Sequence, residues 1–165
     1  MSDVPIRTAV VPVSEVLDLR WEVLRPGLPR ESAVFPEDDH PATFHIAAYG
    51  DGDGTGEADA VLGCATFFPD PLPGATEPAY RFRGMASAPA VRGRGFGAAV
   101  LRAGTAEAAA RGARLLWCNG RTVARGFYEH HGFAVRGEEF EIEGVGPHYV
   151  FVKNVGSAKD TGGAR

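Results

Sequence analysis

The chain has 165 residues, 44% of them hydrophobic and 23% charged, which predicts a soluble globular protein with a sizeable core and excludes a disordered chain. Its net charge of −4, from 17 Lys and Arg against 21 Asp and Glu, argues against a general nucleic-acid binder. The sequence has no apolar run of the roughly 18 residues that a membrane helix needs, no signal-peptide pattern and only two cysteines, so a cytoplasmic protein with reduced thiols is expected.

The first half of the chain predicts three strands and one helix, separated by loops rich in proline and glycine. Ser14 is the expected N-cap of the helix, whose apolar residues continue to about Leu24. The acidic, glycine-rich residues 50–56 predict a hairpin loop between the second and third strands. The expected strands are Ile6–Val13, Thr43–Tyr49 and Ala60–Phe68, and the expected loops are Pro26–Pro41 and Pro69–Pro78.

In the second half of the chain, expected strands alternate with expected helices, and a glycine follows each helix. Gly112 and Gly132 follow the two expected helices and are suited to ending them. This order of elements predicts one mixed α/β (α+β) domain over residues 1–153, and the small polar residues 154–165 predict a disordered tail. The expected strands are Tyr80–Ser87, Leu115–Cys118, Phe133–Arg136, Phe140–Ile142 and Tyr149–Val152, and the expected helices are Ala98–Arg111 and Thr122–His131.

Charge is distributed unevenly along the chain. Residues 81–125 contain nine arginines and one acid, whereas residues 31–60 contain eight acids and neither lysine nor arginine. Two interpretations stay open: an ordinary solvated surface, or a basic segment that binds a polyanion and an acidic segment that lies near a cation. The choice of arginine over lysine suits planar, bidentate contacts to phosphate.

The most informative segment is Ser87–Leu101, which places three glycines and two arginines between an expected strand and an expected helix. Glycines let backbone amides approach a ligand, and the first amides of a helix lack internal acceptors, so such a turn binds phosphate readily. A P-loop is excluded because the segment has no lysine. A dinucleotide site is excluded because no acid occurs between Glu107 and Glu129, where the ribose partner would lie. The alternative is a turn whose glycines serve only chain reversal.

Two motifs resemble the GNAT superfamily of N-acetyltransferases. The run Arg92-x-x-Gly95-x-Gly97, between a strand and an alanine-rich helix, is similar to the acyl-CoA pyrophosphate loop of that family. Residues 121–133, with an alanine, a tyrosine four residues later and Gly-Phe opening the next strand, are similar to its later helix. The resemblance covers about Thr43–Lys153. It departs from the family at Arg121, where members often carry asparagine.

The resemblance implies a single-domain fold whose mixed central sheet splays in the middle and is flanked by helices. It also implies an enzyme that moves the acetyl group of acetyl-CoA to a primary amine, on a small molecule or a protein, by direct transfer in a ternary complex. Tyr128 would be catalytic and lie near the thioester sulfur, donating a proton to the leaving thiolate. The residues implied to bind the cofactor are Met85, Ala86, Ser87, Arg92, Gly93, Arg94, Gly95, Phe96, Gly97, Ala98 and Arg121.

Other parts of the chemistry stay open at this point. The acceptor amine must lose a proton, and His45, Glu139, Glu141 and His148 are candidate bases. The acids of residues 37–39 would attract a cationic amine, or they form a solvated loop. A covalent route through Cys118 is disfavoured, because this cysteine ends an expected buried strand.

Several classes of partner and function are weighed against this enzyme. A non-catalytic acyl-CoA sensor that uses the same loop is the main alternative. A basic nucleic-acid module is disfavoured by the overall charge, and no metal is expected because no Cys and His spacing matches a zinc pattern. We expect no membrane partner, and either a monomer or a homodimer.

Overall fold

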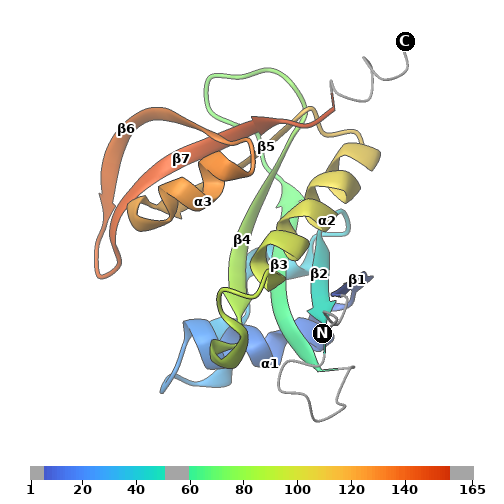
Figure 1. Cartoon of the computed structure of the whole chain (residues 1–165). Helices are drawn as coiled ribbons and strands as arrows, with labels where there is room; N and C mark the ends of the chain where they lie inside the picture. Colours follow the sequence, from blue (N-terminus) through green and yellow to red (C-terminus); the bar gives the residue numbers. More distant parts are fainter. Residues whose placement is uncertain (1–5, 51–59, 157–165) are drawn as a thin grey trace. The chain divides into compact units, whose positions relative to one another are not determined.

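The computed structural model describes residues 6–50 and 60–156. Within these ranges the chain forms seven strands and three α-helices, and it divides into two compact units (Figure 1). The first unit comprises Met1–Phe68 and Gly84–Thr105, and the second comprises Pro69–Arg83 and Ala106–Arg165. Strand β4 and helix α2 each contribute residues to both units. They span Ala79–Ser87 and Phe96–Ala110.

The first unit is built on antiparallel strands in the order β1-β2-β3, with the last residues of β4 beside β3. Side chains alternate between the two faces of β2, so Ala47 packs on one face with Val16 of α1 while Phe44 stacks on Phe67 on the other, with 4.9 Å between the ring centroids. Helix α2 covers that second face, where Gly104 lies against the Phe67 ring. The elements are β1 (Arg7–Val11), α1 (Val13–Leu24), β2 (Phe44–Tyr49) and β3 (Val61–Pro69).

The second unit combines parallel and antiparallel pairs in the order β4-β5-β7-β6. The first residues of β4 pair in parallel with the start of β5, from Ala79 opposite Leu115 to Arg81 opposite Trp117. Strands β5 and β6 both pair with β7 in the antiparallel sense. The remaining elements are β5 (Leu115–Arg121), α3 (Arg125–His130), β6 (Ala134–Ile142) and β7 (Gly146–Asn154).

The predicted mixed α/β class is therefore confirmed, and most strands and helices lie where the sequence placed them. Ser14 is not the N-cap of α1. The helix begins at Val13 after Pro12, which makes no side-chain capping bond, so Ser14 is the second helical residue. A 3-10 turn over Thr122–Ala124 precedes α3, which shortens the predicted second helix. Residues 51–59, most of the predicted acidic hairpin loop, lie outside the described ranges.

The C-terminal strands also differ from the prediction. Phe133–Arg136 and Phe140–Ile142 were expected as separate strands, but they belong to β6, which continues through an irregularity in pairing between Arg136 and Phe140. Strand β7 extends to Asn154, and the amide of the next residue donates to the Arg114 carbonyl at 3.0 Å. Residue 154 therefore belongs to a strand, and residues 157–165 of the predicted tail lie outside the described ranges. Over the described residues, no helix is long and apolar enough to span a membrane.

We predict that Gly104→Ala destabilises the protein, although alanine normally favours a helix by about 1 kcal/mol. A Cβ at Gly104 would overlap ring atoms of the buried Phe67, and overpacking of this kind costs about 1–3 kcal/mol. Gly126→Ala in α3 is the matched control, because a Cβ there meets nothing within 4 Å. Thermal unfolding should show a lower Tm for the first variant and an equal or higher Tm for the second. A Gly104→Ala protein as stable as the parent would contradict this packing.

Candidate functional site

The glycine-rich turn before α2 exposes a set of backbone amides in the first unit. Gly93 and Gly95 have φ values of +81° and +96°, a region that side-chain-bearing residues rarely adopt. The first bond of the helix runs from the amide of Ala99 to the Gly95 carbonyl at 3.0 Å. The amides of residues 95–98 therefore have no acceptor within the helix and lie at its positive end. Residues 92–95 are exposed, so this end is open to an anion.

The side chain of Phe96 holds this turn against the strands. It is 6% exposed, and a Cβ at Gly50 would lie 2.8 Å from its Cζ atom, while a Cβ at Gly63 would lie 3.3 Å from its Cβ. The two glycines thus leave the space that the ring fills. Of the predicted loop residues, Phe96 can offer a ligand only its amide, whereas Arg92 and Arg94 carry exposed side chains.

The predicted pantetheine segment, Met85–Ser87, forms the end of β4 in the same unit. Ala86 is buried in the cluster beneath α1, while Met85 and Ser87 are half-buried. The amide of Ala88 donates to the Leu62 carbonyl of β3 at 2.9 Å, which fixes where the strand ends. This segment and the amides of residues 95–98 therefore belong to the same unit.

Tyr128 of α3 lies in an aromatic cluster of the second unit. Its ring is 4.6 Å from that of Phe151 between centroids and also contacts Phe82 and Phe133. A Cβ at Gly120 would lie 2.6 Å from its Cε2 atom, so the glycine leaves room for the ring. Burial raises the pKa of Tyr128 well above 10, and hydrogen bonding to Cys118 adds to the shift. The phenol therefore stays protonated and can act as a donor throughout the neutral range.

Arg121 and two of the candidate bases lie near the ends of the strands of the second unit. Arg121 is exposed at the end of β5, opposite His148 of β7. The Oε2 atom of Glu139 accepts a hydrogen bond from the Thr122 hydroxyl at 2.8 Å. Because the Gly146 carbonyl can only accept, the 2.8 Å contact from His148 places a proton on Nδ1 of that ring and leaves Nε2 as its basic nitrogen when neutral.

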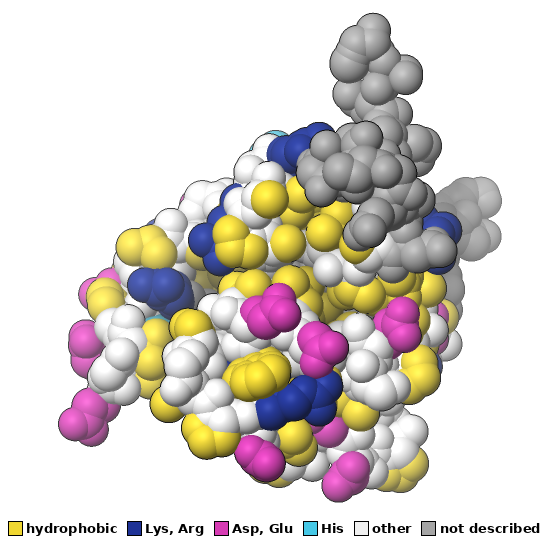
Figure 2. Space-filling model, turned by 90° about the horizontal axis from the view of Figure 1, so that it is seen from below, with side chains coloured by type: hydrophobic (Ala, Val, Ile, Leu, Met, Phe, Trp, Pro, Cys, Tyr) yellow, Lys and Arg dark blue, Asp and Glu magenta, His cyan; other side chains and the backbone are white. Residues whose placement is uncertain are grey.

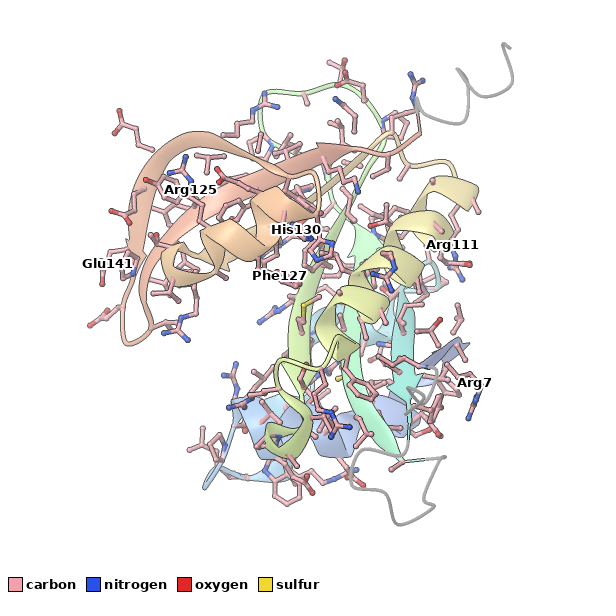
Figure 3. The ribbon with its side chains drawn as sticks, viewed as in Figure 1. Arg7, Arg111, Arg125, Phe127, His130 and Glu141 are labelled. Carbon is pink, nitrogen blue, oxygen red and sulfur yellow. The ribbon has the colours of Figure 1, made fainter. Side chains whose placement is uncertain are left out.

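Figure 3 labels further side chains of this unit. Arg125 and His130 lie at the two ends of α3, and Glu141 lies on β6. Arg125 forms an ion pair with Glu129 at 2.8 Å, and both side chains are about half exposed. Arg125 is therefore engaged within its own helix. Glu141, the remaining candidate base of this unit, is exposed.

The two cysteines are poor nucleophiles in this environment. Burial raises the pKa of both thiols, Cys64 and Cys118, to about 12. Since the thiolate is the reactive form, both residues are largely unreactive at neutral pH. This agrees with the low weight that the sequence gives to a covalent route through Cys118.

Of the acidic residues 37–39, Asp38 is engaged within the protein. The Asp38 carboxylate is paired with Arg20 at 2.8 Å, and its side chain is 3% exposed. The carboxylate of Asp38 is thus unavailable to a cationic amine. On the face shown in Figure 2, acidic side chains are scattered among hydrophobic and uncharged ones.

Within the described ranges, no group of three His, Cys, Asp or Glu side chains could hold a metal ion.

Arg20 is the buried residue that the sequence analysis missed, and its sequence position did carry a signal. Val16, Leu19, Arg20 and Val23 follow the i, i+3, i+4, i+7 spacing of one helix face, so Arg20 lies on the apolar stripe of α1. Arginine is almost never fully buried unless it is paired. An arginine on such a stripe therefore indicates a buried partner, which is Asp38.

We predict that His45 makes the stability of the protein fall as the pH drops below 6.5. This residue of β2 is 5% exposed, with Nδ1 2.8 Å from the Thr66 hydroxyl. Burial lowers the pKa of His45 below its usual 6.5; the Asp38 charge opposes this shift and the Arg20 charge adds to it. The unfolded chain then binds a proton that the folded protein does not. The free energy of unfolding therefore falls by up to about 1.4 kcal/mol for each pH unit below 6.5.

Unfolding by urea at several pH values between 7 and 5 measures this effect. His45→Gln should lessen the loss of stability, because glutamine does not titrate. His130→Gln, which replaces an exposed histidine, should leave the pH dependence as it is. Equal slopes for the parent protein and His45→Gln would contradict the prediction.

A separate pocket of about 400 Å³ lies in the second unit, between residues 69–80 and residues 111–113, which follow α2. It is lined mainly by the loop between β3 and β4, and its polar side chains are those of Asp70, Thr76, Glu77, Tyr80 and Arg111. None of the predicted site residues lines it, so it plays no part in the site described above.

Comparison with known proteins gives one consistent result. The model of the acetyltransferase (GNAT) family matches residues 13–133. The uncharacterized N-acetyltransferase YitI of Bacillus subtilis (strain 168) is 29% identical over 155 residues, which cover 93% of this chain and 99% of YitI. Escherichia coli ElaA has a similar structure, with a TM-score of 0.69 and 16% identity over 92% of this chain and 100% of its own. A chain of the NatC complex bound to Gag peptide and CoA has a TM-score of 0.70 and 14% identity, covering 90% and 98%.

Proposed function

Because the chain belongs to the GNAT family of acetyltransferases, we propose that it transfers the acetyl group of acetyl-CoA to a primary amine, directly within a ternary complex. The chain is an N-acetyltransferase. The seven strands and three helices of its described residues form the fold expected of a member of this family. The proposal concerns the identity of the acetyl donor, the identity of the acceptor and the roles of individual residues.

The observation that carries the proposal is the turn before α2, where residues 92–95 are exposed and the amides of residues 95–98 have no acceptor within the helix. A diphosphate is a large anion, and a helix start with free amides and flanking arginines is suited to bind it. Arg92 and Arg94 add positive charge at the turn, and the backbone of Met85–Ser87 would hydrogen-bond the pantetheine arm. The NatC complex, which has a similar fold, was solved with CoA, and this supports the same donor here.

The acceptor nitrogen must be neutral before it can attack the thioester carbonyl. An alkylamine with a pKa near 10.4 is neutral in only roughly one molecule in a few thousand at pH 7, so a base assists the reaction. The candidate bases are His148, Glu139 and Glu141 in the second unit and His45 in the first. A backbone amide near Met85–Ser87 would stabilise the oxyanion as the carbon–nitrogen bond forms.

Breaking the carbon–sulfur bond releases a thiolate, which Tyr128 would stabilise as the general acid. The proton that the amine loses balances the proton that the thiolate gains. A phenol is already a weaker acid than an alkyl thiol, whose pKa is about 8.5, and burial raises the pKa of Tyr128 further. Full proton transfer is therefore uphill, and the hydroxyl acts first as a hydrogen-bond donor. Arg121, exposed at the end of β5, would pair with a phosphate or with an acidic group of the acceptor.

Two measurements on the purified protein test the function. Calorimetric titration with acetyl-CoA should show binding, and a thiol assay should show CoA release when butylamine, spermidine, lysine or a short peptide with a free amino terminus is added. Binding without release for every amine would favour the non-catalytic sensor. Absence of binding would reject both functions.

A further inference from the structure

Arg20 is bonded to three separate parts of the first unit. Its side chain is 0% exposed. One terminal nitrogen, Nη1, donates to the Ala33 carbonyl and to Oδ2 of Asp38, each at 2.8 Å. The other, Nη2, donates to Oδ1 of Asp38 at 3.1 Å and to the Thr66 hydroxyl of β3. The guanidinium therefore joins α1, the segment around residues 33–38 and the sheet.

Asp38 and Phe35 complete this arrangement. The Oδ2 atom of Asp38 also accepts the amide proton of Phe35 at 2.8 Å, so both carboxylate oxygens are occupied. The Arg20 guanidinium lies over the Phe35 ring, 3.9 Å from its centroid. The position of residues 33–38 is thus determined by one buried cation.

The Arg20 and Phe35 side chains lie against the backbone of β4 at Gly84. This glycine has a φ of +71°, and a Cβ there would lie 2.8 Å from Cε2 of Phe35 and 3.5 Å from Nε of Arg20. Gly84 directly precedes Met85, the first residue of the proposed pantetheine segment. The Arg20 and Phe35 side chains therefore pack against the strand position from which that segment continues.

Stability alone does not explain the pair. Burying two charges costs desolvation, and apolar residues of similar volume often replace such a pair with no loss of stability. The Nε–H of Arg20 is also buried without an acceptor, which adds an unsatisfied donor. What the pair does supply is a fixed geometry, since a bidentate fork holds its partners in one arrangement.

We propose that Arg20 is a positioning residue for acetyl transfer: by fixing Phe35 against Gly84 of β4, it sets the strand backbone that would face the thioester carbonyl. This role rests on the proposed function. Diphosphate binding depends on the amides of residues 95–98 and not on Arg20, so Arg20 governs turnover and leaves the affinity for acetyl-CoA unchanged. A small displacement of reacting groups lowers turnover by up to about 100-fold.

The double variant Arg20→Met/Asp38→Leu tests this role, because it removes both charges together and leaves no unpaired ion. We expect kcat to fall about 10- to 100-fold with the amine that the parent protein uses best, while the Kd for acetyl-CoA changes by less than about threefold. Amide hydrogen exchange in residues 84–87 should become faster, a readout that needs no activity.

The matched control is Arg30→Ala/Asp18→Ala. This ion pair, at 2.6 Å, also joins α1 to the segment after it, but its side chains are 46% and 71% exposed. Its loss should change neither kcat nor the exchange of residues 84–87. If the double variant does not fold, Thr66→Val removes one Arg20 bond together with the contact of the same hydroxyl to His45, and it should lower kcat severalfold with the Kd unchanged. His45→Gln keeps the Arg20 bond and should lower kcat less.

A folded double variant with the kcat of the parent protein would overturn the proposal, as would equal losses in kcat and acetyl-CoA affinity. If Thr66→Val is the variant used, unchanged kcat overturns it. A parent protein that transfers no acetyl group to any amine rejects the proposed function instead. The exchange measurement then still decides whether Arg20 fixes the β4 backbone at Gly84, and unchanged exchange rejects that.

Discussion

Tyr128→Phe is expected to lower kcat about 100-fold while the Kd for acetyl-CoA stays the same. Phenylalanine keeps the ring, which lies 4.6 Å from that of Phe151 between centroids, and removes only the hydroxyl that would donate to the leaving thiolate. General acid catalysis contributes about 10²- to 10⁴-fold, and the raised pKa of Tyr128 favours the lower end of this range. Steady-state rates at saturating acetyl-CoA, together with calorimetric binding, measure the two quantities separately.

Tyr149→Phe is the control for this experiment. Tyr149 is a half-buried tyrosine of β7 in the same unit, and its ring also packs near Phe151, at 6.1 Å between centroids. Removing its hydroxyl should change kcat less than about twofold, since exposed or half-exposed changes away from the reacting groups have small effects. If Tyr128→Phe turns over as fast as the parent while it binds acetyl-CoA normally, Tyr128 is a packing residue and the general acid is another group.

The glycine loop could be predicted from the sequence because its chemistry is local. Residues 92–98 contain the glycines that permit positive φ at Gly93 and Gly95 and the start of the helix whose amides they expose. Strand, turn and helix are contiguous in the chain, so no tertiary information is needed. The glycines that end the two helices could be predicted for the same reason. Gly112 and Gly132 have φ values of +100° and +90°, as expected of glycines that follow a helix.

The contacts of Arg20 with Asp38 and Thr66 could not be predicted in the same way, because both partners are distant in sequence. Asp38 lies 18 residues away and Thr66 lies 46 residues away. The spacing on α1 places Arg20 on the apolar face, but it does not say which carboxylate neutralises it. The charge of residues 31–60, counted from the sequence, therefore overstates the acidity that a ligand would meet, because Asp38 is paired internally.

Strand β6 was divided in the prediction for a physical reason. Gly137, Glu138 and Glu139 interrupt the apolar pattern, and such a run usually marks a turn. In the structure Gly137 has a φ of +83° and the pairing with β7 shifts at this point, so the run is an irregularity within one strand. Local composition indicates that regular pairing stops, whereas only the partner strand determines whether the strand continues.

Gly95→Ala is expected to raise the Kd for acetyl-CoA about tenfold or more, with kcat at saturation changed less than about threefold. Gly95 has a φ of +96°, and alanine there costs about 1–2 kcal/mol of backbone strain. Among the described residues, a Cβ would meet only Ile6 Cδ1, at an ordinary 3.6 Å, so the expected effect comes from the backbone and not from a clash. Relaxing the strain turns the amides of residues 95–98 away from the diphosphate. Calorimetry and saturation kinetics measure the two constants.

Gly112→Ala separates loss of binding from loss of stability. Gly112 follows α2 at its other end, has a φ of +100° and leaves nothing within 4 Å of an added Cβ, so it carries a comparable strain without the amide cluster. Both variants should show a similar fall in Tm, but only Gly95→Ala should lose affinity for acetyl-CoA. Because backbone strain is matched between them, equal affinities in the two variants would mean that the turn before α2 does not bind the diphosphate, and the proposed donor site would be rejected.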